Sequence, residues 1–200
     1  MSLTVEFTLD MSKLPKSAFT DVTAGAWYYD AALYAYNKGL MVGTSDTAFG
    51  PDVPMTRAML VAVLHRLAGS PSVSGKMPFT DVEADTWYTE AVLWAYQNDI
   101  VAGTSDTTFE PLSNITREQI VAIFSRYTAK FAPDKAKAAA ELTAFADSAS
   151  VSDWAVNDMK WAVAQKIISG SENAGKFYLL PQDNASRAQV ATILMQYCAL

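Results

Sequence analysis

Residues 79–127 read FTDVEADTWYTEAVLWAYQNDIVAGTSDTTFEPLSNITREQIVAIFSRY, and the chain of 200 residues carries this pattern three times. Phe79-Thr80-Asp81-Val82 recurs as Phe19-Thr20-Asp21-Val22 and, more loosely, as Phe145-Ala146-Asp147-Ser148. The first two copies are 60 residues apart, whereas the spacing to the third grows from 66 to 70 because that copy has extra residues around 171–180. Units of this size in tandem predict a repeat architecture.

Each copy contains two segments with helical periodicity. The first places apolar residues at i, i+4, i+7 and i+8, and the second at i, i+3, i+4 and i+7, so each forms one apolar stripe. Thr116 and Gln119 open the second segment with a capping-box sequence, Ser186 and Gln189 repeat it, and Met59 removes the return bond in the first copy. The pattern predicts an all-α fold in which three tandem helical repeats pack their second helices around a shared axis, as a nearly threefold bundle.

The repeats are expected at 19–69, 79–129 and 145–200, packed as one compact domain over 19–200. Residues 68–78 are rich in Ser, Gly and Pro and predict a loop, whereas the Ala- and Lys-rich stretch 129–142 can hold a helical turn or more. Residues 1–18 are interpreted as an N-terminal extension or linker.

A glycine follows the first helix in every copy, at Gly43, Gly103 and Gly170. A left-handed C-cap or tight turn would account for these glycines. Further along the same connection, Phe49, Phe109 and Phe177 are expected to tuck beneath the loop before the second helix begins.

Composition excludes several classes of function. The formal charge of −6 leaves no basic excess for a nucleic-acid backbone. No apolar run approaches 18 residues, which argues against insertion into a membrane. A single cysteine, Cys198, and a single histidine, His65, cannot build a disulfide framework or a Cys/His zinc site, so neither a metal nor another cofactor is expected.

These motifs resemble the S-layer homology (SLH) repeat, for which three tandem copies are usual. The resemblance rests on the Phe-x-Asp-Val opening, the tryptophan at the start of the first helix, the glycine-led loop with its phenylalanine and proline, and the Thr-Arg pair opening the second helix. Departures from the pattern are Met59, Gln119 and Gln189 in place of its glutamate, and Ser148 and Ser186 in the third copy.

The resemblance implies a pseudo-threefold helical prism with carbohydrate grooves between neighbouring repeats. It also implies noncovalent anchoring of an exported protein to a bacterial secondary cell wall polysaccharide, often through a pyruvylated amino sugar. The chain would then be a monomeric module of a larger protein, located in the cell wall or S-layer outside the cell.

Three of the five arginines, Arg57, Arg117 and Arg187, occupy the same position in the three copies, at the first turn of the second helix. A cation there meets the positive end of the helix dipole and gains nothing locally. A guanidinium beside free helix amides would instead bind a carboxylate. The alternative is an ion pair with the aspartate of a neighbouring repeat. Arg66 and Arg126 are expected to be solvated.

Three further sets recur with the arginines. Asp21, Asp81 and Asp147 could cap the helix that follows them or accept hydrogen bonds from sugar hydroxyls. Trp27, Trp87 and Trp154 could stack on a pyranose ring, although aromatic residues at this spacing are more often core. With the resemblance, we expect Asp, Trp and Arg to line each groove together, with Gly43, Gly103 and Gly170 letting backbone amides approach the ligand.

Two other functions compete with glycan binding. Catalysis would require a nucleophile with a base, paired perturbed carboxylates or a metal, and the sequence shows no such arrangement, so we expect no enzyme activity. His65 lies within the second helix and is expected to be packed or solvated. The other alternative is a helical repeat scaffold that binds a protein through exposed tyrosines such as Tyr29 or Tyr34.

Overall fold

The computed structural model describes residues 19–200 and is mostly helical, as predicted; the extension expected at 1–18 lies outside the described residues. Six α-helices occur in pairs, two from each repeat. They are α1 (Tyr29–Asn37), α2 (Arg57–Leu67), α3 (Thr89–Gln97), α4 (Arg117–Phe131), α5 (Val156–Ala164) and α6 (Arg187–Cys198). Short 3₁₀ turns are η2 (Pro133–Lys137), η3 (Ser148–Ser150) and η4 (Asp153–Ala155), and an unpredicted hairpin pairs β1 (Ser171–Asn173) with β2 (Lys176–Tyr178).

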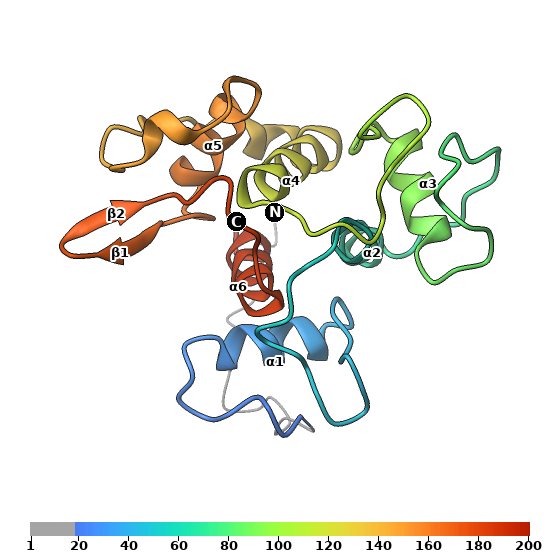
Figure 1. Ribbon diagram of the computed structural model, residues 1–200, viewed down its shortest axis with the longest axis horizontal. Coiled ribbons are helices and arrows are strands. Elements are labelled where there is room, and N and C mark those ends of the chain that lie inside the picture. Colours follow the sequence, from blue (N-terminus) through green and yellow to red (C-terminus); the bar gives the residue numbers. More distant parts are fainter. Residues whose placement is uncertain (1–18) are drawn as a thin grey trace, which may run out of the picture.

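Helices of different repeats pack against each other more extensively than helices of the same repeat. Figure 1 shows α2, α4 and α6 towards the centre, with α1, α3 and α5 outside them. The close pairs are α3 with α2, α5 with α4 and α1 with α6. The first helix of each repeat therefore covers the second helix of the repeat before it, and α1 completes the cycle by covering the last one. A single repeat cannot bury its own apolar stripes, which explains why the repeats form a common core.

The residues just before α2, α4 and α6 form a cycle of backbone hydrogen bonds. Met55 N donates to Ala185 O over 2.8 Å, Ile115 N to Met55 O over 3.0 Å, and Ala185 N to Ile115 O over 3.2 Å. All three side chains are buried. The three second helices thus begin beside one another, held by main-chain bonds that do not depend on side-chain identity.

The start of each second helix follows the sequence closely. Thr116 and Ser186 accept hydrogen bonds from the amides of Gln119 and Gln189, whose side chains return the bond, so both capping boxes are confirmed. Thr56 accepts from Met59 N without a return bond, also as predicted. The Ala- and Lys-rich connection contains the end of α4 and the turn η2, as its composition indicated.

Two predictions for the connecting loops need correction. Phe49 and Phe109 are fully buried, but Phe177 is 49% exposed and Leu179 occupies the buried place instead. The third connection differs because its extra residues form the hairpin, which carries Phe177 on β2.

The second correction concerns Gly43 and Gly103, which do not have the positive φ of a left-handed C-cap, one of the two expected explanations, whereas Gly170 has a positive φ of +80°. Crowding explains all three glycines. An added Cβ would lie 2.6 Å from the Phe19 ring at Gly43, 2.7 Å from the Phe79 ring at Gly103 and 2.7 Å from the Phe145 ring at Gly170. Loop carbonyls crowd the first two positions as well, with Ser45 O nearest to a Cβ at Gly43 and Ser105 O nearest to one at Gly103. Glycine is therefore required because the loop backbone and the first phenylalanine of the same repeat leave no room for a side chain.

No helix in the described part of the chain combines the length and apolar character that a membrane crossing needs.

Candidate functional site

Three grooves lie between the repeats, and each is built from all three of them. In every groove, the glycine loop and the second helix of one repeat form a wall. The preceding repeat adds an arginine, and the following repeat adds a tryptophan. Groove 1 combines loop 41–44 and α2 with Arg187 and Trp87, groove 2 combines loop 101–104 and α4 with Arg57 and Trp154, and groove 3 combines loop 167–171 and α6 with Arg117 and Trp27. Their volumes are about 260, 440 and 330 Å³ respectively.

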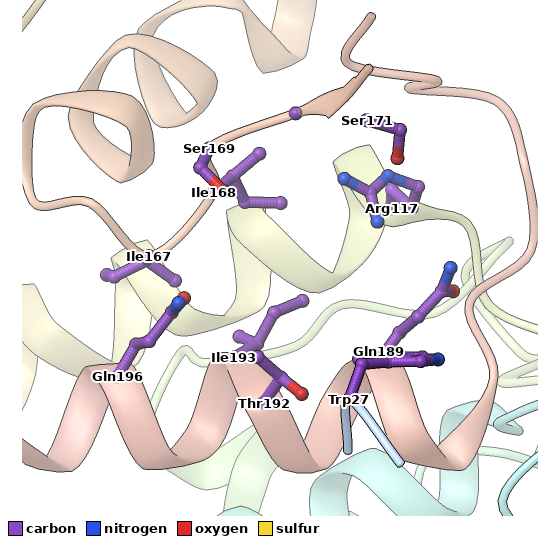
Figure 2. A pocket seen from close by; sticks show the side chains of 11 residues that line it. Trp27, Arg117, Ile167, Ile168, Ser169, Ser171, Gln189, Thr192, Ile193 and Gln196 are labelled. Atoms are coloured by element: carbon purple, nitrogen blue, oxygen red, sulfur yellow. The ribbon is translucent and has the colours of Figure 1, made fainter. Parts of the chain in front are cut away.

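Figure 2 shows groove 3 from close by. Gln189, Thr192, Ile193 and Gln196 follow one face of α6, and Arg117 lies across from them near Ser171. Trp27 lies near Gln189 at the end of this face. The groove therefore presents a guanidinium, an indole and a row of uncharged, mostly polar side chains to the same space.

The three arginines hold neighbouring repeats together. Arg57 Nε donates to Phe109 O over 2.8 Å, Arg117 Nε to Leu179 O over 2.7 Å and Arg187 Nε to Phe49 O over 2.9 Å. Each acceptor belongs to the next repeat in the cycle. An arginine has five N–H donors, so these bonds orient the guanidinium while leaving other donors for a ligand.

The first-turn amides beside these arginines are not free, which corrects the predicted anion site. Arg57 N and Ala58 N donate to Ser113 O and Pro111 O of the next repeat, at 3.0 and 2.9 Å. The same pairs of bonds start α4, from Arg117 N to Asp183 O and Glu118 N to Pro181 O, and α6, from Arg187 N to Val53 O and Ala188 N to Pro51 O. An anion in a groove would have to be held by side chains rather than by helix amides.

Burial lowers the pKa of Arg57, Arg117 and Arg187, and carboxylates at longer range offset part of that effect. The offsetting groups include Asp81 for Arg57, Asp147 for Arg117 and Asp21 for Arg187, in each case the aspartate of the next repeat. The ion pairs found among residues 19–200 involve lysines only. The alternative hypothesis of a direct Arg–Asp ion pair is therefore wrong, because the aspartates attract the arginines only at longer range. The guanidiniums keep their charge.

The aspartates join the two halves of their own repeat instead of capping a helix, so the capping prediction is wrong. The two carboxylate oxygens of Asp21 accept from the amides of Phe49 and Gly50 at 2.8 and 2.7 Å. Asp81 accepts from Phe109 N and Glu110 N, and Asp147 from Leu179 N and Leu180 N, with the same geometry. Because both oxygens are engaged, the aspartates shape the backbone that receives each arginine.

The tryptophans are surface residues rather than core. Trp27, Trp87 and Trp154 are 67%, 57% and 54% exposed, and each lines a groove. An exposed indole beside a polar groove offers both a ring face and an N–H donor. Gly43, Gly103 and Gly170 also line these grooves, each in the groove formed by the loop and second helix of its own repeat.

Sequence reasoning missed the helical wall of the grooves. Position by position, this wall consists of Met59, Gln119 and Gln189; Ala62, Ala122 and Thr192; Val63, Ile123 and Ile193; and Arg66, Arg126 and Gln196. Arg126 is exposed as predicted, whereas Arg66 is half-buried and donates to Leu40 O over 3.1 Å. The recurrence of arginine nine residues after Arg57 and Arg117 was the signal that could have identified this row.

Glu118 is a second residue that the sequence did not single out. Its side chain is 2% exposed and accepts from Ser152 N at 3.0 Å, Ser152 Oγ at 2.8 Å and Gln182 Nε2 at 2.8 Å. Alanine occupies the equivalent positions, Ala58 and Ala188. Glu118 therefore holds the segment that carries Trp154 into groove 2.

Other candidate residues have structural roles. His65 is buried, which is the packed rather than the solvated environment that was expected for it, and its Nε2 lies 2.9 Å from Pro71 O. Tyr29 and Tyr34, the anchors of the alternative scaffold function, are half-buried and pack against the core. Among residues 19–200, no group of three or more His, Cys, Asp and Glu side chains is placed to hold a metal ion.

Comparisons with known proteins confirm the three tandem copies. The pattern of the S-layer homology domain family matches residues 18–58, 78–121 and 144–191. An endoglucanase of Bacillus sp. (strain KSM-635) is 29% identical over 183 residues, covering 92% of this chain and 19% of that protein. An amylopullulanase of Thermoanaerobacterium thermosulfurigenes is 30% identical, covering 84% of this chain and 9% of that protein. The surface-layer 125 kDa protein of Lysinibacillus sphaericus is 31% identical, covering 78% of this chain and 13% of that protein.

Proposed function

The chain belongs to the S-layer homology domain family, and we propose that it is a noncovalent anchor that binds an acidic secondary cell wall polysaccharide in its grooves. Its similarity to a surface-layer protein supports a location at the bacterial cell surface. The chain spans less than a fifth of the three relatives described above. This supports the role of a module that attaches a larger exported protein to the wall.

The observation that carries the proposal is the composition of the grooves. Each groove contains at least one arginine, an exposed tryptophan and no acidic side chain, in a chain whose net charge is −6. Fixed guanidiniums bind carboxylates through charge-assisted hydrogen bonds, and indole rings pack on pyranose faces. A pyruvylated amino sugar has both chemical features, so it is the ligand we propose.

The proposed architecture is the pseudo-threefold prism implied by the repeat. The cycle of backbone bonds through Met55, Ile115 and Ala185 supports it, as does the cyclic pairing of the helices. We also propose that the module acts as a monomer, without catalysis and without a cofactor. Its recurring arginines and aspartates bond to backbone carbonyls and amides rather than forming a nucleophile and base.

Protein binding by a helical scaffold is the less favoured function. Tyr29 and Tyr34 lie half-buried against the core, whereas the exposed aromatic residues that recur in all three repeats line the grooves. The surface most suited to binding is therefore the one that a glycan would use.

The test is sedimentation of the purified chain with isolated cell walls, before and after the polysaccharide is extracted. A Trp27→Ala, Trp87→Ala, Trp154→Ala variant removes exposed side chains only and should remain folded while losing most wall binding. Leu112→Ala is the matched control, because Leu112 is 66% exposed but lines none of the grooves. An Arg57→Ala, Arg117→Ala, Arg187→Ala variant, checked for folding by circular dichroism, tests the guanidiniums.

Equal binding to extracted walls, or unchanged binding by both triple variants in folded form, would contradict the proposal. Removal of the pyruvyl group from the polysaccharide tests recognition of the carboxylate separately from binding of the polysaccharide itself. Loss of most affinity supports recognition of the carboxylate, whereas equal binding assigns the arginines a purely structural role.

A further inference from the structure

A fourth cavity, here called the end cavity, lies where the C-terminal ends of α2, α4 and α6 meet α1 and η2. Its volume is about 520 Å³, larger than any of the three grooves. The side chains that matter for its chemistry are Tyr34, Lys38, Arg66, Tyr127, Lys135 and Tyr197. A space of this size accepts a ligand as large as a monosaccharide or a substituted aromatic ring.

The end cavity concentrates positive charge in an acidic protein. Lys38, Arg66 and Lys135 come from three different elements, and no acidic residue lines the cavity. Within residues 19–200, none of these three cations forms an ion pair; the pairs found there are Lys130 with Asp99 and Lys160 with Glu141. The field of the three cations is therefore available to an anion inside the cavity.

Helix dipoles account for only part of this grouping. A cation at a helix C-terminus offsets the dipole, which fits Lys38 at the C-cap of α1 and Arg66 in the last turn of α2. Lys135 lies in the short 3₁₀ turn η2, and Arg66 also donates to Leu40 O, outside its own helix. Tertiary packing is what brings these cations from three elements to one cavity.

Arg66 differs from the other half-buried and buried arginines in its surroundings. Burial lowers the pKa of Arg66 as it does those of Arg57, Arg117 and Arg187, but carboxylates offset the effect only for the other three. Arg66 is a partly desolvated cation facing a cavity with no carboxylate to balance it. An incoming anion would supply the missing charge.

Aromatic rings form the rest of the wall. Tyr127 packs against Phe131 with ring centroids 4.9 Å apart and against Tyr197 at 6.0 Å, and Phe131 is 46% exposed. Burial raises the pKa of Tyr34 and Tyr127 to about 12, so both hydroxyls stay protonated at neutral pH and can donate hydrogen bonds. The cavity thus pairs ring surface and O–H donors with its cations.

We propose that the end cavity is a binding site, separate from the grooves, for a small organic anion whose carboxylate or phosphate meets Lys38, Arg66 and Lys135 and whose body packs on Tyr127 and Phe131. Such an anion can be a soluble metabolite or an acidic unit of the wall polymer. The site does not depend on what the grooves bind, because only Arg66 is shared with a groove.

The probe is phenyl phosphate, titrated into the isotope-labelled full chain and followed by NMR. We expect saturable shifts at Tyr34, Lys38, Tyr127, Lys135 and Tyr197, weaker binding of inorganic phosphate, and no binding of the neutral phenyl β-glucoside. A Lys38→Gln, Lys135→Gln variant should bind phenyl phosphate about tenfold more weakly. Both lysines are exposed, so this variant keeps the fold.

The matched control is Lys130→Gln, Lys160→Gln, which removes the same charge from lysines outside the cavity. Equal loss of affinity in the control, unchanged affinity in the cavity variant, or equally strong binding of the neutral glucoside would overturn the proposal. So would phenyl phosphate shifts confined to the grooves.

Acidic fragments of the wall polysaccharide distinguish the two sources of the anion. Shifts in the end cavity with these fragments assign the site to the wall polymer. Shifts with phenyl phosphate alone assign it to a soluble anion. The triple tryptophan variant should still bind phenyl phosphate, so failure of the groove proposal and failure of this one give different results.

Discussion

The first two repeats and the third receive the arginine of the preceding repeat on different surfaces. Arg187 lies 4.8 Å from the centre of the Phe49 ring and Arg57 lies 4.6 Å from that of Phe109, whereas Arg117 meets Leu179. In all three cases the guanidinium keeps its bond to the backbone carbonyl. The junction therefore requires a carbonyl acceptor and a buried apolar side chain beneath the guanidinium. The aromatic ring of Phe49 or Phe109 adds a cation–π contact that Leu179 cannot make.

The grooves differ in charge as well. Each groove has one arginine from the preceding repeat. Groove 1 has Arg66 and groove 2 has Arg126 in addition, whereas groove 3 has Gln196 at the equivalent position. Groove 3 therefore carries one cation where the others carry two. If the ligand is an acidic glycan, groove 3 should bind it more weakly than grooves 1 and 2.

The largest effect is expected when the surface beneath the arginine is removed. Phe109→Ala should lower the free energy of unfolding by about 4 kcal/mol, because it empties a fully buried site and takes away the ring under Arg57. Leu179→Ala should lower the free energy of unfolding by about 3 kcal/mol, because a smaller side chain is removed and no cation–π contact is lost. Urea denaturation measures both values, and an equal or larger loss for Leu179→Ala would contradict the distinction between the repeats.

The next effect concerns the junction between the second and third repeats. Glu118→Ala should lower the free energy of unfolding by about 2–3 kcal/mol, because it leaves the donors of Ser152 and Gln182 without their buried carboxylate. Glu90→Ala, at an exposed site, should stay within about 0.5 kcal/mol. NMR should show altered indole signals for Trp154 and unaltered signals for Trp27 and Trp87; a uniform change would argue against a local positioning role.

A smaller effect should follow from equalising the charge of the grooves. Gln196→Arg should strengthen binding of an acidic ligand in groove 3 about threefold, and Arg126→Gln should weaken groove 2 by a similar factor, as expected for partly exposed charges. The indole signals of Trp27 and Trp154 report these two grooves separately in a ligand titration. Unchanged affinities in both variants would mean that this helical position lies beyond the reach of the ligand.

The smallest effect concerns Asp158, which stands where the first two repeats have the buried residues Ala31 and Ala91. Asp158→Ala should raise the free energy of unfolding at pH 7 by about 0.5 kcal/mol from helix propensity, and removal of the half-buried charged carboxylate should add to this gain. Burial raises the pKa of Asp158 above its usual 3.8, so the folded chain holds this proton more tightly than the unfolded chain. The stability gained at acid pH is lost as the pH rises through the raised pKa.

The advantage of Asp158→Ala should therefore shrink as the pH falls through the raised pKa towards 3.8, and it should stay constant below 3.8. Thermal unfolding of both proteins across this range measures the trend. An advantage that grows towards acid pH would show that Asp158 is stabilised in its charged form, through Ser125 and Arg126, rather than penalised by burial.

Local features of the site were predictable to the extent that they depend on neighbours in sequence. The caps of α4 and α6 and the buried Phe49 and Phe109 followed from residue type and spacing. The role of Asp21 did not, because its partners Phe49 and Gly50 lie 28 and 29 residues away and only the folded loop brings them together. Phe177 was misplaced because an insertion shifted the alignment without leaving a local signal of the hairpin.

The amino-acid sequence alone specified three pairs of helices, with a side-chain cap on the second helix of each pair, and an arginine, an aspartate, a tryptophan and a glycine in each copy. Helical periodicity and capping act within a few residues, so they can be read along the chain. Which copy supplies which side of each groove depends instead on how the three repeats pack in space. Arg187 donates to Phe49 O, which is 138 residues away along the chain. This contact closes the cycle only when all three repeats are packed together, so the sequence of a single repeat does not predict it.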